Sequence, residues 1–140
     1  MSQVNDCIKV IKKSAKGFKP QVGLILGSGL GQFSKHIDVV ASIDFKDLPG
    51  FPIAGVGGHA GKLLLGQVSG TDIAILQGRA HYYEKGKADT MAVAIQTLNT
   101  IGCQSLIITN AAGSLNSDAA PGSVMPVSYT HLTLPTILLV

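Results

Sequence analysis

Residues 21–31 read Gln21-Val-Gly-Leu-Ile-Leu-Gly-Ser-Gly-Leu-Gly31, an apolar run that stops abruptly at a glycine-rich loop. A short continuous apolar run of this kind is typical of a buried strand. The glycines that follow allow a tight turn or the close approach of another group to the backbone. Residues 105–114 repeat the arrangement, with Ser105-Leu-Ile-Ile-Thr109 predicting a second buried strand before the loop Asn110-Ala-Ala-Gly-Ser114.

The segment before that second strand predicts a helix over residues 88–101, with Gly102 at its C-terminal cap. Its apolar residues recur at helical spacing and are expected to share one face: Met91, Ala92, Ala94, Ile95, Leu98 and Ile101. A helix that joins two buried strands is a βαβ unit. The stretch therefore favours an α/β fold.

Further elements surround this unit. Residues 4–16 predict a surface helix with Val4, Cys7, Ile8 and Ile11 on its apolar side, ending before Gly17 and Pro20. Residues 38–45 predict a strand, and 47–58 a loop. Residues 62–68 and 72–77 predict a hairpin around Ser69-Gly70-Thr71. We therefore predict an α/β fold with a mixed β-sheet flanked by helices.

Composition narrows the class of protein. The chain has 140 residues, 46% hydrophobic and 14% charged, which predicts one globular domain and excludes a disordered chain. The net charge is +3, but the N-terminal lysines fall on the polar side of a helix without interleaved aromatic residues, so we expect no nucleic-acid partner. The two cysteines and four histidines show no metal-ligand spacing. No run approaches the ~18 residues of a membrane helix, so we expect a cytoplasmic protein without membrane contact.

The glycine-rich segments do not fit the nucleotide-binding motifs that they partly match. The loop of residues 27–31 has Gln32 where a GxGxxG motif needs its third glycine. Residues 55–60 match GxGxxG/A literally, but they precede an apolar strand instead of opening a helix. Gly61-Lys62 does not complete a Walker A loop, because Val56 and Leu63 occupy required positions.

Three strands are expected to end in polar loops at residues 27–31, 78–86 and 110–114, and ligands of open α/β sheets bind at carboxyl strand ends. Ser28 lies among backbone N–H groups that can approach an anion. Arg79, the only arginine, and His81 suggest oxyanion recognition. Each of these segments, and His59 in its glycine-rich loop, also fits a plain turn or a solvated side chain. Brought together they would form a phosphate pocket, with an asparagine and a tyrosine available for a polar organic substrate.

Four segments in order carry a resemblance: Leu26-Gly-Ser-Gly-Leu-Gly31, Gly58-His-Ala-Gly-Lys62, Gly78-Arg-Ala-His-Tyr-Tyr-Glu84 and Thr109-Asn-Ala-Ala-Gly113. With them, residues 5–125 resemble the purine nucleoside phosphorylases of the trimeric type. The resemblance implies conversion of a purine ribonucleoside or deoxyribonucleoside and inorganic phosphate into the free base and the pentose 1-phosphate. It implies phosphate as co-substrate, no metal or organic cofactor, and a homotrimer. Methylthioadenosine phosphorylases share this fold, but the loop from Gly78 favours the purine nucleoside enzymes.

Carried over by position, the resemblance assigns two groups of residues. It implies that phosphate is held by Ser28, His59, Arg79, His81 and the backbone N–H of Ala111. It implies that Tyr83 and Asn110 border the nucleoside. Ser114 and Lys85 depart from the family pattern within loops.

The resemblance stops after Met125, and members of the family are longer than this chain. We therefore expect residues 1–125 to be the N-terminal half of a nucleoside phosphorylase domain and residues 126–140 to be an unrelated tail. The base-recognising residues would be absent, apolar sheet edges would be uncovered, and the chain alone would be inactive. Two other readings stay open, a dinucleotide-binding module and an inert fragment that pairs with a full-length subunit.

Overall fold

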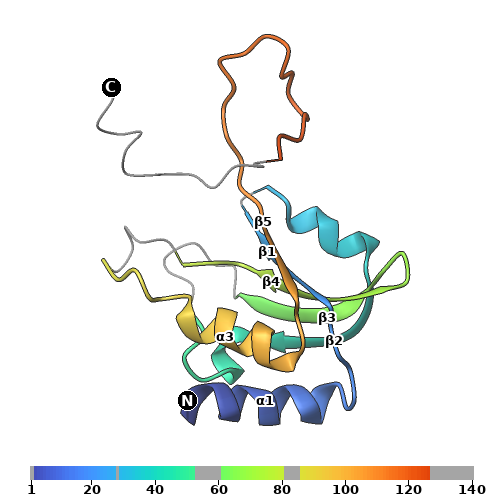
Figure 1. The fold of residues 1–140 in the computed structure, drawn as a ribbon, viewed down its shortest axis with the longest axis vertical. Helices are drawn as coiled ribbons and strands as arrows, with labels where there is room; N and C mark the ends of the chain where they lie inside the picture. Colours follow the sequence, from blue (N-terminus) through green and yellow to red (C-terminus); the bar gives the residue numbers. More distant parts are fainter. Residues whose placement is uncertain (1, 28, 53–60, 81–85, 127–140) are drawn as a thin grey trace.

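The computed structural model describes residues 2–27, 29–52, 61–80 and 86–126, and these form a five-stranded sheet with helices (Figure 1). The strands are β1 (Val22–Leu26), β2 (Asp38–Asp44), β3 (Lys62–Val68), β4 (Thr71–Gln77) and β5 (Ser105–Ile108). Their order across the sheet is β2-β3-β4-β1-β5. Strand β3 is antiparallel to β2 and β4, whereas β1 is parallel to β4 and β5. The prediction of a mixed sheet is confirmed.

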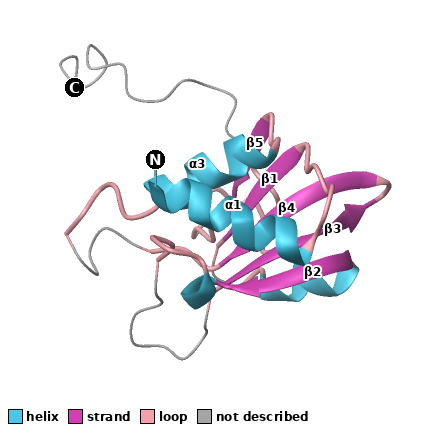
Figure 2. Cartoon of the chain, turned by 90° about the horizontal axis from the view of Figure 1, so that it is seen from below, coloured by secondary structure: helices cyan, strands magenta, loops and turns pink. Residues whose placement is uncertain are grey.

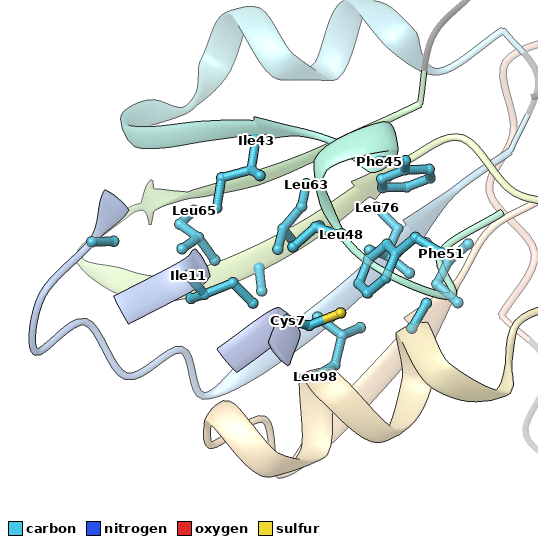
Figure 3. Packing of buried hydrophobic residues seen from close by; sticks show 14 residues of the cluster. Cys7, Ile11, Ile43, Phe45, Leu48, Phe51, Leu63, Leu65, Leu76 and Leu98 are labelled. Carbon is cyan, nitrogen blue, oxygen red and sulfur yellow. The ribbon is translucent and has the colours of Figure 1, made fainter. Parts of the chain in front are cut away.

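Two helices, α1 (Ser2–Ser14) and α3 (Ala92–Ile101), lie side by side on one face of the sheet (Figure 2). Helix α1 buries Val4, Cys7 and Ile11, three of the four residues expected on its apolar side. Alternation along the strands sends Leu63 and Leu65 of β3 into this layer, where they meet the helices. Figure 3 shows this main core, which the long aliphatic residues of β3 and β4 share with α1 and α3.

The opposite face of the sheet carries a smaller apolar cluster. Leu64 of β3 and Ile75 of β4 belong to it, together with Leu26 of β1. Phe33 from the 3-10 helix Gly31–His36 packs against this cluster. Both faces of the central strands are therefore covered, which explains why their sequences are continuously apolar.

The hairpin between β3 and β4 turns through two residues, Ser69 and Gly70. Their φ angles are 49° and 78°, and Val68 pairs directly with Thr71. Positive φ at both central residues is the type I′ arrangement, whose twist matches that of the flanking strands. The hairpin prediction is confirmed, with Thr71 opening β4 instead of lying in the turn.

Helix α3 differs from its prediction at its start and in one apolar residue. It begins at Ala92 and not at residue 88, because the Thr90 hydroxyl donates to the Lys87 carbonyl and Ala92 N–H donates to Asp89 in turn geometry. Its buried residues are Ala94, Thr97 and Leu98, whereas Ile95 is 38% exposed. The buried stripe is thus rotated away from Ile95.

Strand β5 was expected to be buried, and this prediction is wrong. Its aliphatic residues Leu106, Ile107 and Ile108 are 40%, 52% and 61% exposed. The strand lies at the sheet edge with β1 as its neighbour, so neither face is covered over its full width. The expectation of an uncovered apolar edge is confirmed within the described residues. Among those residues, no helix is long and apolar enough to cross a membrane.

Candidate functional site

The candidate site lies at the carboxyl ends of three neighbouring parallel strands, β4, β1 and β5. Ile25 of β1 is in register with Leu76 of β4 and Ile108 of β5, so all three strands end at the same edge of the sheet (Figure 1). The loops that begin at Gly27, Gly78 and Thr109 all leave from this edge. The sequence placed its candidate loops at these strand ends, and the structure brings the described parts of them together.

The loops after β1 and β5 are joined by hydrogen bonds at Thr109. The Gly27 N–H donates to the Thr109 hydroxyl at 2.9 Å. That hydroxyl donates to the Ile25 carbonyl at 3.1 Å, and the Thr109 N–H donates to the same carbonyl at 3.0 Å. A Cβ on Gly27 would lie 2.5 Å from the Thr109 carbonyl oxygen and 2.8 Å from Asn110 Cα. Only glycine therefore allows this approach.

Arg79 connects the loop after β4 to the same point. Its Nη1 donates to the Thr109 carbonyl at 3.1 Å. Its Nε is buried and makes no hydrogen bond to any described residue. Gly78, with a φ of 125°, turns the chain out of β4 where a Cβ would lie 3.3 Å from Gly61 Cα. The guanidinium is thus held beside the loops after β1 and β5.

Charge at this edge is not balanced by the ion pairs of the described residues. Those pairs join Lys9 to Asp6, and both Lys46 and Lys62 to Asp44, and none includes Arg79. Leaving a buried donor without an acceptor costs about 1–3 kcal/mol, and more when the group is charged. An oxyanion would supply both the acceptor and the negative charge that Arg79 lacks in the described part of the chain.

Asn110 and Ala111 follow Thr109 directly and are both exposed. The Asn110 amide Nδ2 donates weakly to the Ala111 carbonyl at 3.4 Å. These two predicted site residues therefore lie at the same edge as Arg79. They directly follow Thr109, whose carbonyl accepts the hydrogen bond from Arg79. The predicted residues Ser28, His59, His81 and Tyr83 lie outside the described residues, as do positions 127–140 of the expected tail.

Thr109 is the part of the site that sequence reasoning missed as a functional residue. It was expected as the last residue of a strand and as the first residue of the fourth segment that carries the resemblance, without a role of its own. The available signal was a hydroxyl-bearing β-branched residue between an apolar run and the Asn110 loop. Such residues often replace a backbone group in a hydrogen bond at the end of an element.

Both cysteines lie away from this edge and are protonated thiols. Burial raises the pKa of Cys103 to about 11, and the Cys103 sulfur lies 3.6 Å from where a Gly23 Cβ would be. Burial is also the main cause that raises the pKa of Cys7, whose Sγ–H donates to the Pro49 carbonyl at 3.2 Å. Neither thiol therefore supplies a thiolate nucleophile near neutral pH. Within the described segments, no three His, Cys, Asp or Glu residues group as metal ligands.

Comparison of this chain with known proteins finds a matching family model and several relatives. The family model described as "Phosphorylase superfamily" matches residues 21–133. Purine nucleoside phosphorylase 1 of Geobacillus stearothermophilus is 43% identical over 109 residues, which are 78% of this chain and 40% of that protein. Purine nucleoside phosphorylase of Mus musculus is 36% identical over 118 residues, covering 84% of this chain and 40% of that protein.

Solved structures show the same likeness. The purine nucleoside phosphorylase from Schistosoma mansoni in complex with acetate superposes with a TM-score of 0.74 at 35% identity, over 86% of this chain and 44% of that one. A purine nucleoside phosphorylase in complex with ribose-1-phosphate superposes with a TM-score of 0.72 at 35% identity, again over 86% and 44%. The chain therefore spans less than half the length of these relatives.

Proposed function

Because the chain belongs to the phosphorylase superfamily, we propose that it provides the phosphate-binding part of a purine nucleoside phosphorylase. The proposed reaction is phosphorolysis of purine ribonucleosides and deoxyribonucleosides to the free base and the pentose 1-phosphate. The observation that carries this proposal is Arg79 at the meeting point of three strand ends, with its Nε buried and without an acceptor among the residues that the structure describes. The names of the relatives and the ribose-1-phosphate complex support the choice of substrate class.

The reaction needs an anion held below the sugar. A phosphate oxygen forms a bond to C1′ of the pentose as the N-glycosidic bond breaks, and the electron pair of that bond leaves with the base. The base takes up one proton, which balances the proton that hydrogen phosphate loses on becoming the pentose 1-phosphate. Positive charge develops on the sugar during this exchange, and a fixed phosphate stabilises it. In our proposal Arg79 orients the phosphate, together with Ser28, His59, His81 and the N–H of Ala111. Phosphate is the nucleophile and co-substrate, so the proposal involves no protein nucleophile, organic cofactor or metal.

Other parts of the proposal concern the rest of the protein. Asn110 and Tyr83 would border the ribose. We propose a cytoplasmic homotrimer as the state of the full-length form, without nucleic-acid or membrane partners. Residues 1–125 would form the N-terminal half of the domain, and residues 126–140 a segment without a role in the site. The 140-residue chain by itself is then expected not to turn over inosine in the presence of phosphate.

The phosphate proposal can be tested on a single resonance. Arg79 is the only arginine, so the arginine Nε–H cross-peak in a 1H-15N spectrum belongs to it without assignment. Titration with inorganic phosphate should shift this peak saturably, because the buried Nε gains an acceptor. Arg79→Lys lacks this peak, so its phosphate Kd is measured by calorimetry beside the unmodified chain. It should be at least about tenfold higher, the factor for a charge-assisted contact of ~1.5–3 kcal/mol.

Controls separate this site from general attraction of anions. Lys12→Met removes an exposed positive charge from α1, on the helix-covered face, and should leave the phosphate Kd unchanged. A peak that stays in place through millimolar phosphate would refute the phosphate site. Saturable NAD binding that shifts the same peak, without a response to phosphate, would instead support the dinucleotide-binding alternative.

A further inference from the structure

We propose that Thr109 is a positioning residue that holds Arg79 ready for the anion, through an exchange of hydrogen-bond partners at the end of the sheet. This inference deepens the phosphate-binding function proposed above and rests on it. Thr109 begins the loop after β5 and bonds to the two other loops. Its hydroxyl accepts a hydrogen bond from the Gly27 N–H, and its carbonyl accepts one from Arg79 Nη1. No other described residue of this edge bonds to both neighbouring loops.

The exchange is visible when the parallel ladder is followed residue by residue. Ile25 pairs with Ile108, and the Ile25 carbonyl accepts the Thr109 N–H at 3.0 Å, as a parallel pair requires. The next bond of such a ladder would run from the Gly27 N–H to the Thr109 carbonyl. In the structure the Gly27 N–H donates instead to the Thr109 hydroxyl at 2.9 Å. One backbone acceptor of the ladder has thus been replaced by a side-chain acceptor.

This replacement leaves the Thr109 carbonyl available to a different donor. Arg79 Nη1 donates to it at 3.1 Å. A guanidinium presents its donors in a fixed planar arrangement, so anchoring one terminal nitrogen also limits where Nε can point. In this anchored guanidinium, Nε is buried and finds no acceptor in the described part of the chain. Thr109 therefore acts on the anion through Arg79, while its own atoms are occupied within the protein.

The steric surroundings agree with this role. A Cβ on Gly27 would lie 2.5 Å from the same Thr109 carbonyl oxygen. The carbonyl therefore occupies the space that a side chain at position 27 would need. Glycine at that position lets Thr109 bond to Gly27 and to Arg79 at the same time. By contrast, the buried Thr97 hydroxyl donates to Val93 within one turn of α3 and lies beside the Cys7 thiol of α1, and it bonds to none of the described parts of the three loops.

Thr109→Val is the decisive variant, because it replaces the hydroxyl by a methyl group of similar shape. Without the hydroxyl, the Gly27 N–H should move to the Thr109 carbonyl and compete there with Arg79, which weakens the anchoring of the guanidinium. We expect the phosphate Kd, measured with the Arg79 Nε–H signal, to rise about fivefold, and Thr109→Ser to keep it within about twofold of the original. Thr97→Val is the matched control, since it removes a buried hydroxyl elsewhere, and should leave the Kd unchanged.

A structural readout makes the result independent of phosphate affinity. Through-hydrogen-bond N–C′ couplings should connect Thr109 N to Ile25 C′ in the unmodified chain, with no coupling from Gly27 N to Thr109 C′. The second coupling should appear in Thr109→Val. Its presence in the unmodified chain would overturn the proposal even if Thr109→Val does not fold, as would a Kd that Thr109→Val leaves unchanged. If the couplings are as expected but phosphate does not bind, the phosphate function fails while the partner exchange stands.

Discussion

Gly27→Ala tests the close approach of the loops after β1 and β5. The added Cβ would meet three backbone atoms at 2.5, 2.8 and 3.0 Å, so the nearest contact is about 0.9 Å too short for ordinary packing. Overpacking of this kind costs about 1–3 kcal/mol, and loss of the Gly27–Thr109 hydrogen bond adds about 1 kcal/mol. Reduced freedom of the unfolded chain returns about 0.4–1 kcal/mol. We expect a net loss of about 2 kcal/mol in the free energy of unfolding.

Urea unfolding followed by circular dichroism measures this loss. For a domain of this size, ~2 kcal/mol corresponds to a midpoint about 1 M lower in urea. Gly31→Ala is the matched control, because it lies four residues further on, at the start of the 3-10 helix, and its Cβ would meet only Gln77 Nε2, at an ordinary 3.8 Å. If the two variants unfold at the same urea concentration, the two loops do not approach as described, and the geometry of the site is refuted.

Two further predictions concern the exposed edge and a buried thiol. The chain should associate as its concentration rises. In analytical ultracentrifugation, Ile107→Lys on β5 should reduce this association, because it places a charge on the apolar edge. An equal effect of Val40→Lys on the opposite edge strand would show that the association does not depend on β5 in particular. Cys103 should react slowly with a thiol reagent at pH 8 in a Cys7→Ser background and quickly in urea, since the folded pKa is about 11. The thiol of the unfolded chain ionises with its ordinary pKa of 9.0, so the free energy of unfolding should fall as the pH rises from 9 to 11. An equal fall in the free energy of unfolding of Cys103→Ala would contradict this.

Local sequence patterns predicted the elements well where neighbouring residues determine the backbone. The hairpin turn is an example, because Gly70 adopts its positive φ angle without strain and serine is a common turn residue. The start of α3 could not be predicted, since residues 88–91 have the apolar spacing of a helix and yet form turns. A hydroxyl bond from Thr90 to Lys87 competes there with the helical bond pattern.

The sequence predicted that Arg79, Asn110 and Ala111 would lie at one edge of the sheet, but it did not predict the hydrogen bonds that connect this edge. Arg79 was singled out because a lone arginine in a loop after a strand suggests an oxyanion, and the structure places it at the expected sheet edge. Its anchoring on Thr109 depends on which carbonyl remains available 30 positions further along the chain. That choice is made by the ladder between β1 and β5, and no local pattern around Arg79 contains it.

Burial in β1 and β5 shows where a sequence pattern stops being informative. Both strands are continuous aliphatic runs, a composition suited to strands with both faces covered. Strand β1 lies between β4 and β5, and its Ile25 is 4% exposed, whereas Ile108, its partner in register on β5, is 61% exposed. The same composition thus gives opposite burial, because position in the sheet order decides how much of each side chain is covered. Burying the exposed apolar side chains of β5 against another surface would be favourable, because it would remove them from water. A charge at Ile107 should therefore weaken association of the chain more than it lowers the stability of the sheet.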